Sequence, residues 1–418
     1  MKNTQNLIDF IKKSTDCYHA VDTVCKSLDE KGFTKLCESE KWDIEKGGGY
    51  YVTRNSSSVI AFKIPETVNA QFKICASHTD SPCFKLKSDF EIEADGTVKL
   101  SVEGYGGMIM SSWLDRPLSI SGRVVTVKDG KVETKLVNID RDLLVIPNLA
   151  IHMSRDINKG YEFNIAKDMC PIAGGEKGAL IDAVAECAQV DKADIKGFDL
   201  SVYNRMKGTV LGASNEYFSA PRIDDLQCVF STLEGFLNSD GDSISMFSAF
   251  DNEEVGSGTK QGAKSSFLRD VMERVCESLD IDYKQALSQS FMLSCDNAHA
   301  VHPNHAEKSD SNNRVYMNKG IVIKYNANQK YTTDAVSEAV VKYICEKADV
   351  PYQMYANRSD MAGGSTLGNL SNEKVSLNTA DIGLAQLAMH SAYETAGVKD
   401  TTYMIDFVKA FYGTKLEF

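Results

Sequence analysis

Histidine and carboxylate residues gather in a few short stretches of the 418-residue chain. His78 and Asp80 form an HxD pair directly after a short apolar run. This spacing suits a metal-bound histidine whose other ring nitrogen donates to a nearby carboxylate, which fixes the tautomer and raises the basicity of the ligand. A plain surface loop after a strand explains this motif equally well when it is taken alone.

Acidic residues recur where other elements are expected to begin or end. Asp224 and Asp225 open a helix-like stretch after a Pro-Arg turn, where an aspartate is also an ordinary N-cap. The apolar run at 244–250 ends in three acids within four residues, among them Glu253 and Glu254. Acids at the carboxyl end of a strand lie where open α/β sheets bind ligands. Adjacent glutamates also allow one to bind a metal while the other moves protons; a solvated acidic loop is the alternative.

Asp296 and His390 are further candidates. Asp296 follows the apolar run at 291–294, and His299 and His302 come just after it. We favour Asp296 as a metal ligand and the two histidines as hydrogen-bonded support for the loop. His390 follows an apolar run that is expected to be helical, where a lone histidine is more often a satisfied core residue.

Taken together, these stretches supply two imidazoles and three carboxylates: His78, Asp224, Glu254, Asp296 and His390. A mixed nitrogen and oxygen set without sulfur suits a pair of divalent ions of the zinc, manganese or cobalt type, and argues against a closed structural zinc site. The 11 cysteines include no CxxC pair. They therefore fit buried reduced thiols better than a disulfide framework.

The elements that must position these residues alternate between strand and helix. Short apolar runs predict strands at residues 72–76, 244–250, 291–294, 320–325 and 374–377. Asp224 and Asp225 open a predicted helix whose apolar residues over 226–237 share one face. Such alternation is typical of helices packed around a central sheet.

A β-rich stretch interrupts this pattern. Between residues 90 and 140, alternating segments flank the pairs Asp95-Gly96 and Asp129-Gly130, which predicts consecutive β-hairpins. We therefore predict an α/β fold in which residues 1–86 and 219–418 form a central mixed sheet flanked by helices. Residues 87–218 form an inserted β-rich domain.

Composition narrows the classes of function. Lys and Arg number 46 against 58 Asp and Glu, which gives a formal charge of −12. This balance does not support nucleic-acid binding, which needs a concentrated basic face. No run approaches the ~18 apolar residues of a membrane span, and the first residues lack the pattern of a secretory signal. We expect no nucleic-acid partner, no membrane association and a cytoplasmic location.

In type and order, these motifs resemble those of the aspartyl aminopeptidases, a family of dizinc metallopeptidases. The resemblance runs along nearly the whole chain, through SHTDSP, WLDRPL, IPNLAIHM, SAPRIDDL, FDNEEVGS, DNAHAVHPN, GIVIKYNANQKY, GGSTLG and DIGLAQLAMHS. It implies a catalytic α/β domain split by a dimerisation domain, with dimers assembled into a tetrahedral dodecamer. It also implies removal of N-terminal residues from peptide substrates, with a preference for Asp or Glu.

The resemblance further implies a metal site with two divalent ions per subunit, zinc first and manganese or cobalt as alternatives. Asp224 would bridge both ions. His78 and Asp296 would complete the shell of one ion, and Glu254 and His390 that of the other.

The same resemblance implies three further roles. Asp80 would orient His78, and Glu253 would be the general base. His152, in the inserted domain, would reach the site of a neighbouring subunit. Lys324, on the strand expected at 320–325, is our candidate for binding an acidic substrate side chain, ahead of Arg358; a solvated surface cation is the alternative for each.

The chain departs from the family pattern at Asp225, where Asn is usual, and at Tyr393, where Arg is customary. Two alternatives for the function remain open. One is a metallo-aminopeptidase of neutral or broad specificity on the same scaffold. The other is a non-catalytic assembly or peptide-binding protein.

Overall fold

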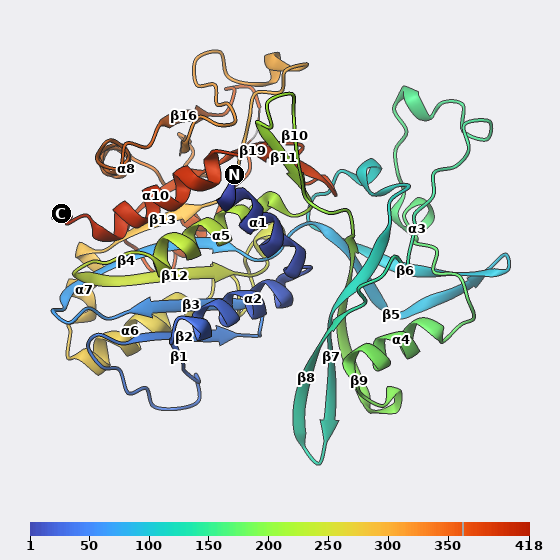
Figure 1. Cartoon of the computed structure of the whole chain (residues 1–418), viewed down its shortest axis with the longest axis horizontal. Helices are drawn as coiled ribbons and strands as arrows, with labels where there is room; N and C mark the ends of the chain where they lie inside the picture. Colours follow the sequence, from blue (N-terminus) through green and yellow to red (C-terminus); the bar gives the residue numbers. More distant parts are fainter. Residues whose placement is uncertain (362) are drawn as a thin grey trace. The chain divides into compact units, whose positions relative to one another are not determined.

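The computed structural model describes residues 1–361 and 363–418, which divide into two compact units (Figure 1). The first unit comprises Met1–Asp80, Gly208–Met389 and Glu394–Phe418. The second comprises Ser81–Lys207 and His390–Tyr393. Strands and helices alternate in the first unit and strands dominate the second, so the predicted α/β fold with a β-rich insertion is confirmed.

A nine-stranded sheet organises the first unit, in the order β1-β2-β3-β12-β4-β13-β17-β15-β16. The strands are β1 (Thr34–Lys35), β2 (Gly49–Arg54), β3 (Ser58–Lys63), β12 (Ser243–Phe250), β4 (Asn69–His78), β13 (Phe291–Cys295), β17 (Asn378–Gly383), β15 (Ile321–Tyr325) and β16 (Tyr352–Ala356). β12, β4, β13 and β17 run parallel, whereas β3 and β15 pair antiparallel to their inner neighbours. The sheet is therefore mixed, as predicted.

Helices pack on both faces of this sheet, which is why its central strands are nearly continuous apolar runs. On β4, for example, Cys75 packs in one core cluster and Ile74 in the other, because successive side chains point to opposite faces. The first cluster includes α1 (Lys2–Lys13), α2 (Cys17–Glu30), α5 (Ile223–Leu237), α8 (Ala335–Lys347) and α10 (Asp400–Gly413). The second includes α6 (Phe267–Leu279), α7 (Tyr283–Gln289) and α9 (Leu367–Ser371).

A second, five-stranded sheet in the same unit has the order β10-β11-β19-β18-β14. Its strands are β10 (Thr209–Leu211), β11 (Tyr217–Ala220), β19 (Glu394–Gly397), β18 (Ala385–Leu387) and β14 (Ala298–His299). Because β10 and β11 pair here with β19, residues 208–218 belong to the first unit rather than to the predicted insertion. The N-terminal boundary of the insertion also differs from the prediction, since the second unit begins at Ser81 and not at residue 87.

The second unit is built on a five-stranded antiparallel sheet in the order β6-β5-β9-β7-β8. Its elements are β5 (Cys83–Ala94), β6 (Thr97–Tyr105), β7 (Leu118–Lys128), β8 (Lys131–Asn138), β9 (Ile195–Asn204), α3 (Ile165–Asp168) and α4 (Ala179–Ala188). Both predicted hairpin turns are confirmed: Asp95-Gly96 joins β5 to β6, and Asp129-Gly130 joins β7 to β8. All four turn residues have positive φ, which is the conformation that two-residue hairpin turns require.

Among the helices of residues 1–361 and 363–418, none combines the length and the apolar character needed to cross a membrane.

Candidate metal centre

Parallel strands of the first unit end together where several of the candidate residues lie. β4 ends at His78 and β12 at Phe250, and these two residues are Cα partners across the ladder. β13 ends at Cys295, so Asp296 follows at the same edge. This edge is the carboxyl end of the parallel strands, where open α/β sheets bind ligands. Asp224 comes from a different element, the first turn of α5.

His78 lies at the centre of the cluster and is only 1% exposed. Its Nε2 lies 3.3 Å from Asp224 Oδ1 and 3.8 Å from Asp296 Oδ1. Its Nδ1 faces Asp80, at 3.0 Å from the backbone oxygen and 3.4 Å from Oδ1. Because a proton on Nδ1 is directed at Asp80, Nε2 is left to bind a metal between the two other carboxylates.

Asp80 also holds the acidic turn η4 (Glu253–Val255). Its two carboxylate oxygens accept the backbone N–H groups of Glu253 and Glu254, each at 3.1 Å. Asp80 is buried, and hydrogen bonds to an ionised carboxylate are stronger than neutral ones. Asp80 therefore contacts the imidazole of His78, chiefly through its backbone oxygen, and fixes through its carboxylate the turn that carries the two glutamates.

The donor set fits a divalent cation. Ligand atoms of His78, Asp224, Asp225 and Asp296 lie within 4.8 Å of one another, and so do those of His78, Glu253 and Glu254. Imidazole nitrogen and carboxylate oxygen are the donors that zinc takes in catalytic sites, and both suit manganese as well. The geometry of the first unit therefore supports a site for divalent metal.

The electrostatics of the cluster point the same way. Burial and the surrounding carboxylates raise the pKa of Glu253 to about 8, and the pKa values of Glu254 and Asp225 lie well above their ordinary range. Burial alone would lower the pKa of the His78 imidazole, but the nearby carboxylates, Asp225 first, raise it. So many buried acids together are costly without a compensating cation.

Lys324, on β15, lies beside the cluster with its side chain buried. Its Nζ is 3.3 Å from Asp296 Oδ2 and donates to the Asn297 carbonyl oxygen at 2.8 Å. Burial raises the pKa of Asp296, but the Lys324 ammonium and the His78 imidazole together outweigh it and hold this pKa below its ordinary range. Lys324 thus has an anionic partner within the protein. Arg358, the other candidate cation, is ion-paired to Asp360 on the surface.

Two buried acids support the cluster without having been predicted to contribute. Asp225 is fully buried, and its Oδ2 accepts the backbone N–H of His78 at 3.1 Å. Glu394, on β19, accepts the backbone N–H of Asp224 at 3.0 Å. Asp225 adjoins the candidate ligand Asp224 in the sequence, and this adjacency is a signal that could have drawn attention to it. Glu394 stands 170 positions from its partner Asp224, so nothing near it in the sequence indicates the contact.

The two remaining candidates, His390 and His152, belong to the second unit. His390 lies in a turn with a φ of 68°, and its Nδ1 is 2.6 Å from the Gly107 carbonyl oxygen. The expectation of a helix before His390 is wrong: the preceding apolar run forms β17 and β18, because a run buried on both sides is compatible with either helix or strand. His152 lies in an exposed turn.

A family described as Aminopeptidase I zinc metalloprotease (M18) matches residues 10–412 of the chain. The chain belongs to the M18 family of aminopeptidases. It is 46% identical over 428 residues to the probable M18 family aminopeptidase 2 of Clostridium novyi (strain NT), with 99% of each chain covered. M18 is the aspartyl aminopeptidase family, so the resemblance drawn from the motifs is confirmed.

Solved structures of M18 relatives have the same fold as this chain. The chain superposes with a TM-score of 0.95 and 34% identity on a chain of "Cryo-EM structure of the Ape4 and Nbr1 complex", covering 98% of this chain and 85% of that one. It superposes with a TM-score of 0.87 and 28% identity on a chain of "Structure of S. cerevesiae mApe1 dodecamer", covering 98% and 96%. The M18 match confirms the prediction of a zinc metallo-aminopeptidase and disfavours a non-catalytic scaffold.

Proposed function

We propose that this M18 protein removes acidic residues, Asp or Glu, from the N-termini of peptides and uses Glu253 as its general base. The observation that carries the proposal is the convergence of Asp224 and Asp296 on His78 Nε2, beside a turn that holds Glu253. A water-activating centre and a base in one buried cluster are the parts that peptide hydrolysis needs.

The proposed ligands are divided between two zinc ions, with manganese or cobalt as alternatives. His78 and Asp296 hold one ion, Glu254 and His390 hold the other, and Asp224 is shared. When bound, such ions polarise the peptide carbonyl and lower the pKa of the attacking water toward neutrality. The contact of His390 Nδ1 with the Gly107 carbonyl supports this assignment, because a proton held on Nδ1 makes Nε2 the ring nitrogen that can bind a metal.

Glu253 takes the proton from the attacking water and then delivers it to the departing amine. Two features support this role. Its backbone N–H is bound by Asp80, which fixes the point from which the side chain extends toward the cluster. Partial burial and acidic surroundings raise its pKa above the ordinary range of a glutamate, and a base whose pKa lies near the working pH both accepts and returns a proton efficiently.

We assign His152 to the site of a neighbouring subunit, where it donates a hydrogen bond to the developing oxyanion. Such a donor contributes about 3–4 kcal/mol when well placed. The side chains flanking it are apolar and exposed: Leu149 by 57%, Ile151 by 49% and Met153 by 75%. An exposed apolar segment of this kind favours burial against another chain.

This role requires a homo-oligomer, which we propose to be dimers assembled into a tetrahedral dodecamer. The S. cerevisiae relative described as a dodecamer, which aligns with 98% of this chain, supports that assembly.

Selectivity for an acidic residue is assigned to Lys324, a buried cation that contacts Asp296 of the cluster. One observation favours a second candidate function. Because Lys324 is already ion-paired to Asp296, a substrate carboxylate would have to share its charge. An aminopeptidase of neutral or broad specificity on the same scaffold would not need that sharing.

The test is a panel of aminoacyl p-nitroanilides assayed with zinc-loaded enzyme. The proposal predicts the highest kcat/KM for the Asp or Glu substrate and a selective loss of that preference in Lys324→Met. If the Leu or Ala substrate instead gave the highest kcat/KM, the proposed acidic preference would be wrong and the aminopeptidase of neutral or broad specificity would be supported. Failure to hydrolyse any member, by enzyme shown to carry metal, would overturn the role of the cluster.

A further inference from the structure

Two strands of the second unit separate along part of their length. Within the described residues, β5 pairs with β9 at only two positions, through Phe84 and Lys85. Residues 87–90 of β5 then bulge out of the ladder with β6. On its other side β9 is paired with β7 from Ile195 to Asn204, apart from an irregularity at Lys196. Residues 196–200 of β9 therefore present an open sheet edge, where alternate residues point their N–H and C=O groups away from β7.

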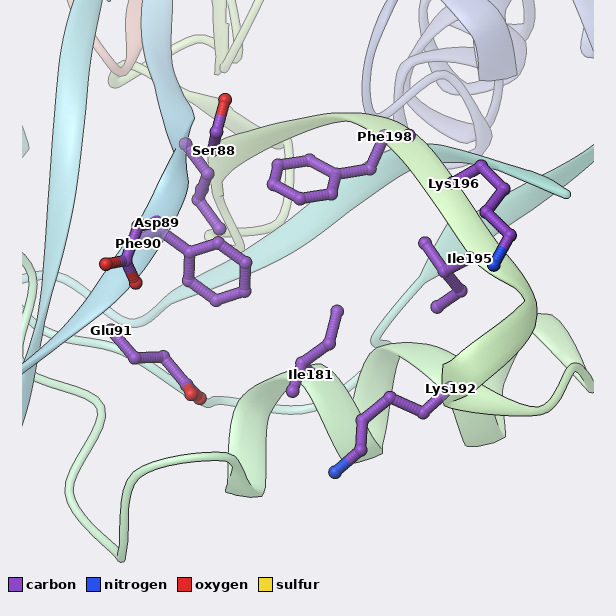
Figure 2. Close-up of a pocket in the computed structure, with 11 residues that line it drawn as sticks. Ser88, Asp89, Phe90, Glu91, Ile181, Lys192, Ile195, Lys196 and Phe198 are labelled. Carbon is purple, nitrogen blue, oxygen red and sulfur yellow. The ribbon is translucent and has the colours of Figure 1, made fainter.

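The gap between the strands is a groove with an apolar floor and a volume of about 510 Å³ (Figure 2). Phe90 of β5 and Phe198 of β9 meet edge to face, with ring centres 5.5 Å apart. Ile181 of α4 and Ile195 line the same space. This volume falls in the ~300–1,000 Å³ range of ligand-binding pockets.

Gly197 lies on β9 inside this groove. Its φ is not in the left-handed region, and a Cβ added there would meet no atom of the described chain within 4 Å. The fold of the second unit therefore does not itself require glycine at this position. Glycine inside a strand often marks a place where a ligand or another backbone approaches closely.

Charges of opposite sign flank the groove. Figure 2 shows the carboxylates of Asp89 and Glu91 on the β5 side and the ammonium groups of Lys192 and Lys196 toward η3 (Lys192–Asp194) and the start of β9. Glu91 accepts the N–H groups at the start of α4, so Asp89 is the acid that is open to a ligand. Lys196 donates to one carbonyl and has further N–H donors to offer.

We propose that this groove binds an extended peptide segment of a partner protein, which adds as a strand to the open side of β9. The main chain of the segment pairs with residues 196–200, and an apolar side chain packs on Phe90 and Phe198. An acidic residue at one end faces Lys196, and a basic residue at the other end faces Asp89. An open strand edge over an apolar floor is the arrangement that strand addition uses.

The probe is the peptide Ac-Glu-Val-Thr-Val-Lys-NH2, whose acetylated N-terminus keeps it from serving as an aminopeptidase substrate. It is titrated into the zinc-loaded, isotope-labelled enzyme while the methyl resonances of Ile181 and Ile195 are followed. We expect saturable shifts of these two resonances with a Kd near or below about 1 mM. The analogue Ac-Glu-Val-Pro-Val-Lys-NH2 should bind more weakly, because proline removes a main-chain donor.

Gly197→Leu should fill the groove without a backbone clash and weaken binding about tenfold or more, a change of 1.4 kcal/mol or above. Thr134→Leu, on the exposed part of β8, is the matched control and should bind the probe normally. If Gly197→Leu does not fold, Lys196→Glu is the second variant. It should bind the probe more weakly than the wild type and the Thr134→Leu control do, because it places a carboxylate against the Glu of the probe.

Three results would overturn the proposal. The first is the absence of saturable shifts at Ile181 and Ile195. The second is equal binding by the wild type and by folded Gly197→Leu or Lys196→Glu. The third is a change in oligomeric state in Gly197→Leu, since this would show that a second copy of the chain covers the groove.

Discussion

Asp80→Asn is the sharpest single test of how the cluster is held together. The substitution keeps the size of the side chain but replaces one carboxylate oxygen with an amide NH2. In the native protein the two oxygens accept the backbone N–H groups of Glu253 and Glu254. The amide can accept only one of these bonds, and its NH2 group then faces the other N–H, donor against donor.

The expected cost follows from these two contacts. A hydrogen bond to a charged group contributes about 1.5–3 kcal/mol, and the variant loses one of them. Because 1.4 kcal/mol corresponds to a factor of ten, zinc affinity should fall about 10–100-fold if the lost bond acts through the position of the glutamate turn. Loss of a partner behind a metal ligand typically costs the same 10–100-fold.

The assay is a competition titration of metal-stripped protein with a fluorescent zinc chelator, together with kcat/KM at saturating zinc. Asp282→Asn is the matched control. Asp282 accepts the Gln285 N–H at the start of α7, where Asn caps almost as well. The control should keep both zinc affinity and kcat/KM. If Asp80→Asn stayed within about twofold of the wild type in both measurements, Asp80 would not position the cluster.

The remaining predictions concern the base, the assembly and a buried lysine. Glu253→Gln should retain zinc by mass spectrometry while kcat falls about 10²–10⁴-fold, and near-normal turnover would exclude Glu253 as the base. Verified mixed assemblies of His152→Ala and Glu253→Gln subunits should regain activity through hybrid sites; no recovery would argue against His152 acting between subunits. Burial lowers the pKa of Lys73 from 10.5 to about 8, so between these pH values the unfolded chain retains a proton that the folded chain has released. The free energy of unfolding of the wild type, measured with urea, should therefore rise with pH relative to Lys73→Met, by up to about 3 kcal/mol, whereas a constant difference would contradict the shift.

Local chemistry explains which parts of the fold could be predicted from the sequence. The Asp-Gly pairs predicted their hairpins because the turn conformation depends on those residues alone. His78 and Asp296 could be placed at one edge because each follows an apolar run, and the carboxyl ends of parallel strands meet at a common edge.

Features set by distant pairing could not be predicted. The C-terminal boundary of the insertion was predicted at residue 218, but the chain returns to the first unit at Gly208. The reason is that β11 pairs with β19, which lies more than 170 residues further along the chain. The strand expected at 374–377 begins only at Asn378, since the preceding residues form the turn after α9. The contact of Lys324 with Asp296 was also not foreseen, because nothing local indicates that a lysine on β15 lies behind a carboxylate at the end of β13.

Anomalous diffraction at the zinc edge, on crystals of the zinc-loaded enzyme, tests the central claim most directly. We predict two peaks, each within ~2.0–2.2 Å of imidazole nitrogen or carboxylate oxygen, with Asp224 contacting both and His78 contacting one through Nε2. A map in which no peak lies within ligand distance of Asp224, or in which His78 contacts no ion, would contradict the proposed metal site.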